Sequence, residues 1–119
     1  MKLHPNELYL YYDPKTGIGK QTLAYAKSIT RHVQDVDWNH TKLSNTVWKE
    51  ILGFLKMQPK DVMDKASDYY QEHIQGHEIA MTGLLEILCH TPELLRGPIA
   101  IKGKKAIVVK TPTDVLKVA

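Results

Sequence analysis

Residues 7–23 read ELYLYYDPKTGIGKQTL and contain an expected strand, the turn after it and the start of a helix. Residues 7–12 are rich in aromatic residues and bounded by turn formers, which is typical of a buried strand. Residues 13–17 contain a proline and a glycine that favour a tight turn. Apolar residues then recur at helical spacing over residues 18–30, and residues 32–38 alternate as a half-buried strand does. This order predicts a β-α-β unit whose two strands are parallel neighbours.

The rest of the chain predicts several helices and a hairpin. Ser44 is a suitable N-cap for an amphipathic helix that ends before Pro59. The further expected elements are an irregular helical stretch over residues 60–76, a helix over 78–90, two buried strands over 97–102 and 105–110 around Gly103-Lys104, and a short helix capped by Thr111 with Pro112 in its first position. No repeat or linker divides the chain.

Composition limits the class of protein. The chain has 119 residues, of which 43% are apolar and 24% charged, so a single globular domain over residues 1–119 is expected. A net charge of +3 is small for a nucleic-acid binder, and no direct nucleic-acid binding is expected. No apolar run is long enough to span a membrane, and the first residues lack a secretion signal. A cytoplasmic protein is therefore expected, in which the lone Cys89 stays reduced.

Three segments together resemble the arsenate reductase (ArsC)/Spx family. Residues 9–23 are similar to its amino-terminal signature, a strand followed by Asn-Pro-Arg-Cys-Ser-Lys-Ser-Arg and a helix containing Thr-Leu. Residues 92–99, PELLRGPI, resemble its Pro-x-Leu-x-x-Arg-Pro-Ile segment, and residues 110–116, KTPTDVL, resemble its closing Arg-Pro-Pro-Glu-x-Val-Leu. The resemblance implies an α/β, thioredoxin-like fold of the glutaredoxin/ArsC type. In this fold helices flank a four-stranded mixed sheet, with a helical insertion between strands 2 and 3.

The residues that carry the family's chemistry are replaced in this chain. Matched by position, the family's nucleophilic cysteine falls on Thr16, and a histidine of the signature falls on Tyr12. The mid-chain catalytic arginine falls on or near Asp64, and the last arginine falls on Lys110. The arginine before Pro-Ile falls on Gly97, with Arg96 displaced by one place. An aliphatic hydroxyl is ~7 pKa units less acidic than a thiol and forms no disulfide. We therefore assign no catalytic residue and expect a catalytically degenerate, arsenate reductase-like protein.

The segment around residue 16 keeps the features of an anion site, because the start of a helix favours negative charge. The expected binding residues are Thr16, Gly17, Ile18, Gly19 and Lys20 and, as the resemblance implies, Arg96, Gly97, Pro98 and Lys110 on the opposite side of a cleft. The resemblance also implies a cis Gly97–Pro98 bond. The ligand would be a small anion or a thiol peptide such as glutathione, with no other cofactor. The plain alternative is that Thr16 caps the helix and the lysines are solvated.

Other roles for the chain stay open at this point. Cys89 reads as a buried, inert thiol, although a residual thiol oxidoreductase that uses Cys89 or a partner's thiol is an alternative. Because Spx-like proteins dock on RNA polymerase, the resemblance also allows a protein-interaction or transcription-linked module. His73 and His77 are four residues apart, but no third ligand accompanies them, so a solvated pair is favoured over a zinc site and no metal ligand is assigned.

Overall fold

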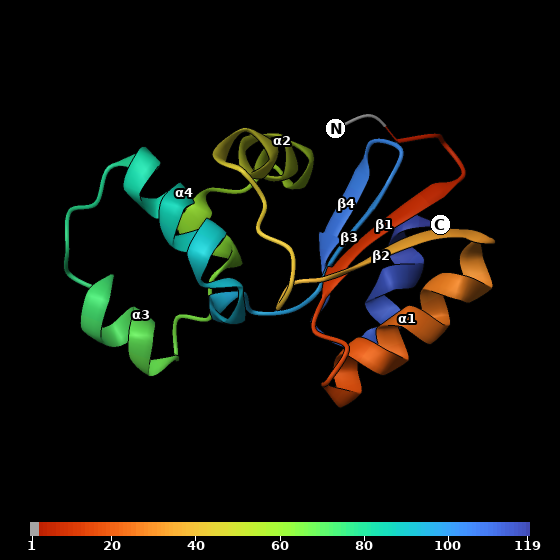
Figure 1. Cartoon of the computed structure of the whole chain (residues 1–119), viewed down its shortest axis with the longest axis horizontal. Helices are drawn as coiled ribbons and strands as arrows, with labels where there is room; N and C mark the ends of the chain where they lie inside the picture. Colours follow the sequence, from red (N-terminus) through yellow and green to blue (C-terminus); the bar gives the residue numbers. More distant parts are fainter. Residues whose placement is uncertain (1–2) are drawn as a thin grey trace.

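A mixed sheet of four strands organises the computed structural model, which describes residues 3–119 (Figure 1). Residues 1 and 2 of the expected domain and of the amino-terminal segment lie outside the described residues. The strands are β1 (Glu7–Tyr12), β2 (His32–Asp37), β3 (Ile99–Lys102) and β4 (Lys105–Val108). Their order in the sheet is β2-β1-β3-β4, with β1 parallel to β2 and β3 antiparallel to both β1 and β4. The predicted sheet, including the parallel pair at its start, is confirmed.

Helices follow the order that the sequence predicts. Helix α1 (Gly17–Ile29) connects β1 to β2. The segments between β2 and β3 are α2 (Asn45–Leu55), η1 (Pro59–Val62), α3 (Asp68–His73), α4 (Met81–His90) and η2 (Pro92–Leu94), and η3 (Pro112–Val118) follows β4. Figure 1 shows this insertion extending away from the sheet on one side, while α1 and the C-terminal η3 lie on the other. The chain thus has an α/β, thioredoxin-like arrangement with a helical insertion between strands 2 and 3.

Both faces of β1 are buried, which explains its nearly continuous apolar sequence. Leu8, Leu10 and Tyr12 belong to the cluster that packs against α1 and η3. Tyr9 and Tyr11 point the other way and belong to the larger cluster that includes α2 and α4. Burial of one Leu side chain contributes about 1.5–3 kcal/mol. Since Leu8 and Leu10 are fully buried, β1 fixes the position of the loop that follows Tyr12.

An aromatic group anchors the chain just beyond β2. Tyr11 makes edge-to-face contacts with Trp38 and Trp48, at ring-centroid distances of 6.1 and 6.0 Å. The Tyr11 hydroxyl donates a hydrogen bond of 2.9 Å to the Thr41 carbonyl. The backbone N–H of Trp38 donates to the Tyr12 carbonyl at 2.9 Å. These contacts hold the segment after β2 beside the end of β1.

The helical stretch predicted over residues 60–76 is divided, and that prediction is wrong in detail. The Asp64 side chain accepts a hydrogen bond of 3.0 Å from the Ala66 N–H, which closes a turn instead of a helix. Ser67 then caps α3 by accepting from the Tyr70 N–H. Gly76, at φ 77°, lies in the left-handed region beyond the end of α3. The next helix begins at Met81, because residue 80 has an extended backbone.

Two further expectations at the carboxyl end need correction. Strand β4 stops at Val108 instead of residue 110, because the Asp114 carboxylate accepts from the N–H groups of Lys110 and Thr111. The predicted short helix with Thr111 at its N-cap and Pro112 in its first position is confirmed, in the form of a 3₁₀ helix. The described residues contain no cis peptide bond, so the cis Gly97–Pro98 prediction is wrong. Over residues 3–119, no helix combines the length and apolar character needed to cross a membrane.

Candidate functional site

The α1 entry loop, defined as residues 13–20, joins the carboxyl end of β1 to the first turn of α1. Thr16 is the N-cap residue, with an extended backbone at φ −91° and ψ 152°. Its Oγ1 accepts a hydrogen bond of 3.0 Å from the Gly19 N–H and donates one of 2.9 Å to the Asp13 carbonyl. The Thr16 hydroxyl therefore donates its proton to a backbone carbonyl, and its two hydrogen bonds hold residues 13, 16 and 19 together.

Gly19 is required by the close approach of two backbone segments. A Cβ atom at this position would lie 2.0 Å from the Asp13 carbonyl oxygen and 2.8 Å from the Thr16 Oγ1. At Gly17 an added Cβ would meet nothing within 4 Å. The two glycines of the loop thus have different roles, because Gly19 permits the tight turn and Gly17 leaves the first position of α1 open.

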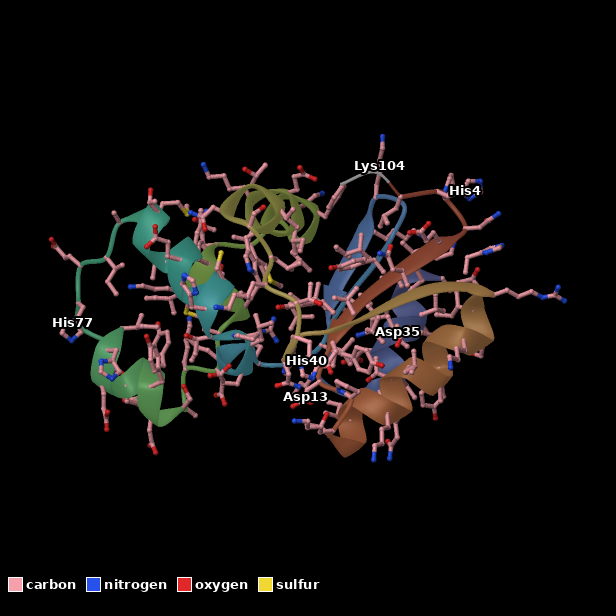
Figure 2. All side chains as sticks on the ribbon, in the orientation of Figure 1. His4, Asp13, Asp35, His40, His77 and Lys104 are labelled. Atoms are coloured by element: carbon pink, nitrogen blue, oxygen red, sulfur yellow. The ribbon has the colours of Figure 1, made fainter. Side chains whose placement is uncertain are left out.

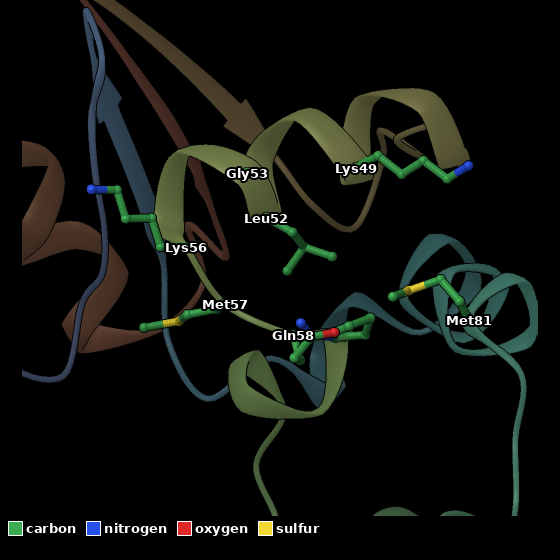
Figure 3. A pocket seen from close by; sticks show the side chains of 8 residues that line it. Lys49, Leu52, Gly53, Lys56, Met57, Gln58 and Met81 are labelled. Carbon is green, nitrogen blue, oxygen red and sulfur yellow. The ribbon is translucent and has the colours of Figure 1, made fainter.

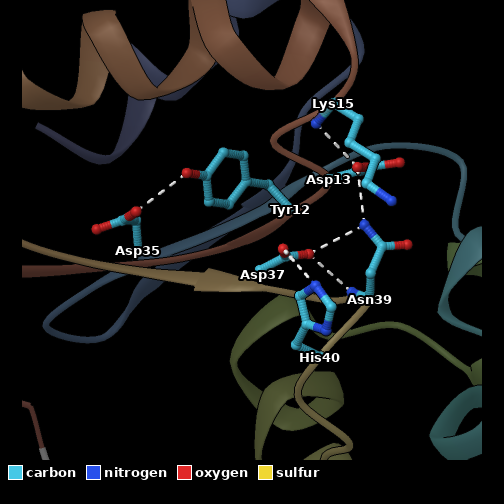
Figure 4. Close-up of polar contacts among 7 residues, drawn as sticks. All are labelled: Tyr12, Asp13, Lys15, Asp35, Asp37, Asn39 and His40. Atoms are coloured by element: carbon cyan, nitrogen blue, oxygen red, sulfur yellow. Dashed lines mark hydrogen bonds and ion pairs between the residues drawn. The ribbon is translucent and has the colours of Figure 1, made fainter.

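A polar cluster ties the α1 entry loop to the end of β2 (Figure 4). The Asp13 Oδ1 accepts hydrogen bonds from the Lys15 N–H at 3.0 Å and from the Asn39 amide at 2.9 Å. The same Asn39 amide donates to the Asp37 Oδ1 at 3.0 Å, and the His40 Nε2 lies 3.7 Å from the Asp37 Oδ2. Figure 2 places Asp13 and His40 together where the sheet meets the insertion. Two carboxylates therefore lie at or next to the loop.

The charge pattern at the start of α1 is mixed but suits a small anion. The first turn holds no acidic side chain, and Lys15 and Lys20 are exposed. The N–H groups of Gly17 and Ile18 have no partner within the helix, as at every helix start. The helix dipole adds a partial positive charge at this end. The Asp13 carboxylate opposes these effects, although two donors already share its Oδ1.

Residues 96–98 of the predicted cleft have packing and hydrogen-bond partners of their own. Gly97 and Pro98 are buried, and an added Cβ at Gly97 would lie 1.9 Å from the Val109 carbonyl oxygen. The Arg96 Nε donates to the Asp61 carbonyl at 2.9 Å, and an amino group of its guanidinium lies 4.0 Å from the Met57 Sδ. Among residues 3–119, no hydrogen bond or ion pair joins the Arg96 or Lys110 side chain to residues 16–20. Thr16 to Lys20 are contiguous in the loop, whereas the Arg96 guanidinium lies against the insertion.

Tyr12 and Asp64 stand where the family resemblance would place a histidine and an arginine, and both have local partners. The Tyr12 hydroxyl donates to the Asp35 Oδ2 at 3.0 Å. Burial and this bond raise the pKa of Tyr12 to about 12. The Asp64 N–H donates to the Leu94 carbonyl at 2.8 Å, and its carboxylate closes the turn before α3. These contacts give both residues structural roles.

Cys89 and the histidine pair offer little chemistry. The Cys89 thiol is 8% exposed and donates to the Asn45 Oδ1 at 3.0 Å. Burial, with a smaller effect from Glu86, raises the pKa of this thiol, which disfavours the reactive thiolate. Helix α3 ends at His73, so His77 does not share a helix with it. No group of three His, Cys, Asp or Glu side chains in the described residues is placed to hold a metal ion.

Comparisons with known proteins support the fold through structure alone. No protein-family model and no curated protein sequence matches the chain. A solved structure from Yersinia pestis, provisionally named an arsenate reductase, superposes with a TM-score of 0.85 at 24% identity, covering 93% of this chain and 99% of that one. An arsenate reductase from Vibrio cholerae gives 0.84 at 21% identity, covering 95% and 98%. A Bacteroides fragilis protein, provisionally described as ArsC family related, gives 0.74 at 9% identity, covering 95% and 99%. At these identities the similarity establishes the fold and not the activity.

Proposed function

We propose that this protein, which has an ArsC-like thioredoxin fold, is a redox-inactive relative of the arsenate reductases. It binds a small anion or a glutathione-like peptide without covalent chemistry. The α1 entry loop is its binding site. One observation carries the proposal: the side chain at the position of the family's nucleophile, Thr16, is a hydroxyl engaged at both its donor and an acceptor position. The proposal is therefore that the fold is retained while the side chain at the position of the family's nucleophile is exchanged.

Chemistry at Thr16 would require a base that the loop does not supply. A hydroxyl becomes a nucleophile when an adjacent group accepts its proton. The Thr16 proton is directed to the Asp13 carbonyl oxygen, which is not a base at neutral pH. The thiol of Cys89 is buried against Asn45, and its raised pKa keeps it protonated. Both observations argue against arsenate or disulfide reduction by this chain.

The free N–H groups at the start of α1 and the adjacent lysines support anion binding. A charge at a helix end contributes about 0.3–1 kcal/mol at an exposed site. Three or four such contributions total about 1–4 kcal/mol before the opposing Asp13 carboxylate is counted, so the Kd is no tighter than about 1 mM. This affinity suits a ligand that is abundant, which glutathione and inorganic phosphate exemplify.

The redox part of the proposal is tested by an arsenate reductase assay with glutathione as reductant. Wild type and Cys89→Ser should both lack turnover, because no accessible low-pKa thiol is present. Arsenate-dependent oxidation of glutathione by the wild type would contradict the proposal. Its loss in Cys89→Ser would then identify Cys89 as the reactive thiol.

The binding part is tested by following the amide resonances of Gly17 and Ile18 during titration with phosphate, arsenate and glutathione. Saturable shifts are expected, and they should weaken in Gly17→Pro, which removes one N–H donor. Proline is well tolerated at the first helical position, and the extended backbone of Thr16 suits a following proline. Lys20→Gln should also weaken binding, whereas Lys27→Gln, in the last turn of α1, is the matched control. Absence of any saturable shift up to about 100 mM ligand at constant ionic strength would refute this part.

A further inference from the structure

The α2 groove is a second candidate site, distinct from the α1 entry loop. It has a volume of about 340 Å³, within the range of small-molecule sites. Leu52 and Gly53 of α2, Pro59 of η1 and Met81 of α4 belong to its lining, as does Met57 between α2 and η1. Figure 3 shows Leu52 pointing into the space between these segments. None of the eight described lining residues belongs to residues 13–20.

Gly53 is an unexpected residue at its position in α2. It lies inside the helix, where alanine is more favourable than glycine. An added Cβ would meet nothing within 4 Å, so no packing contact requires a glycine there. Its φ is not in the left-handed region, so backbone conformation does not require it either. Gly53 lines the groove, so a side chain at this position would occupy part of the groove.

Lys56 is the opposite case, three residues later. It ends α2 in the left-handed conformation, at φ 57° and ψ 43°. The Lys56 N–H donates to the Gly53 carbonyl at 3.3 Å, and the Met57 N–H donates to the Leu52 carbonyl at 3.1 Å. This hydrogen-bond pattern is a Schellman motif, in which glycine usually holds the left-handed position. Lys56 is the one residue other than glycine with positive φ in residues 3–119, and it lines the groove.

These two local exceptions meet at one surface. Exchanging the residue types, with alanine inside the helix and glycine at its end, would favour the fold. Positions where sequence and local structure disagree are frequently functional. Because Gly53 and Lys56 both line the α2 groove, the disagreement points to a role for the groove in binding.

The charge around the groove indicates the kind of ligand. Lys49 and Lys56 flank it, and none of its described lining residues is acidic. In Figure 3 Lys56 at the end of α2 and Lys49 near its middle extend in opposite directions along the helix. The Arg96 guanidinium lies 4.0 Å from the Met57 Sδ and adds a third cation nearby. The neighbouring Asp61 carboxylate accepts the Gln58 N–H at 2.9 Å. Positive charge therefore borders an apolar floor.

We propose that the α2 groove binds a small amphipathic anion, a carboxylate or phosphate monoester with an apolar body. The apolar part lies on Leu52, Met57 and Met81, where its burial is favourable. The anionic group pairs with Lys56, and Lys49 supplies the second cation. This inference does not depend on ligand binding at the α1 entry loop.

The test uses the methionine methyl groups as reporters. Protein labelled with carbon-13 at these methyls is titrated with octanoate and, separately, with octyl phosphate. The Met57 and Met81 resonances should shift and saturate, while that of Met63, which is 1% exposed in the core, should not. The stronger of the two probes identifies the preferred anionic group. Octanamide, which is neutral, and acetate, which lacks the apolar body, should each bind more weakly.

Variants separate binding from folding. Lys56→Gly should weaken octanoate binding about two- to fivefold, in line with the loss of one exposed ion pair, while it raises the melting temperature. Gly53→Leu should fill the groove and weaken binding at least roughly tenfold with the Met63 resonance unchanged. Lys27→Gln is the matched lysine control outside the groove. The proposal is overturned if Met57 and Met81 show no saturable shift, if octanamide binds as tightly as octanoate, or if Lys56→Gly binds like the wild type.

Discussion

Replacing Thr16 by alanine tests the role that the structure gives this side chain. The substitution removes the hydrogen bond from the Gly19 N–H and the one to the Asp13 carbonyl. Loss of an N-cap side chain costs about 1 kcal/mol, and a second hydrogen bond contributes roughly 0.5–1.5 kcal/mol. Since the two bonds share one hydroxyl, we expect a total loss of about 1–2 kcal/mol in the free energy of unfolding.

The loss converts into a measurable change in melting temperature. Unfolding entropy is about 2.1 cal/mol/K per residue, which for the 119 residues of this chain gives about 0.25 kcal/mol/K. Thr16→Ala should therefore melt about 4–8 °C below the wild type, as followed by circular dichroism. Thr16→Ser keeps the hydroxyl and is the matched control, expected within about 0.5 kcal/mol of the wild type. An alanine variant as stable as the serine variant would refute the capping role.

Three other predictions follow from single contacts. Gly19→Ala forces a Cβ against the Asp13 carbonyl and should lower the free energy of unfolding in urea by about 1–3 kcal/mol. Gly17→Ala, with open space around it, should change this free energy by less than about 0.5 kcal/mol, and equal effects would contradict the loop geometry. Because the pKa of Tyr12 is raised from 10.0 to about 12, its contribution to stability is complete below pH 10 and is lost as the pH rises through 12. Tyr12→Phe should therefore flatten the fall in melting temperature between pH 10 and 12, and an unchanged profile would exclude Tyr12 as the source of that fall. Cys89 should react with an aromatic disulfide reagent at least roughly tenfold more slowly in the folded than in the urea-unfolded protein, and equal rates would show that its thiol is accessible.

The elements with strong local signals were predictable from the sequence. The N-caps Thr16 and Ser44 accept from the Gly19 and Val47 N–H groups, as their residue types favour. The aromatic run of β1 and the glycine-lysine turn between β3 and β4 lie where they were predicted. The loop residues of the candidate site were therefore placed correctly relative to α1.

Features that depend on contacts between distant segments were not predictable in the same way. The direction of the Arg96 side chain is set by the Asp61 carbonyl, 35 residues away, and no pattern near residue 96 indicates it. The turn at Asp64 interrupts a helical pattern through a local side-chain bond that competes with the helix. The α2 groove forms where α2, η1 and α4 meet, so its lining residues are scattered over residues 49–81. The left-handed backbone of Lys56 was not predictable from the residue type either, because lysine rarely adopts this conformation.

The pKa of a thiol placed at residue 16 tests most directly whether the α1 entry loop still stabilises negative charge. Thr16→Cys is made together with Cys89→Ser, which leaves a single thiol and keeps a donor for Asn45. The thiolate is followed by its absorbance and by its alkylation rate as the pH changes. The free N–H groups and nearby lysines lower the pKa of this thiol, and Asp13 raises it. The account predicts a pKa well below the ordinary ~8.5 of a free cysteine, and a value at or above ~8.5 would contradict it.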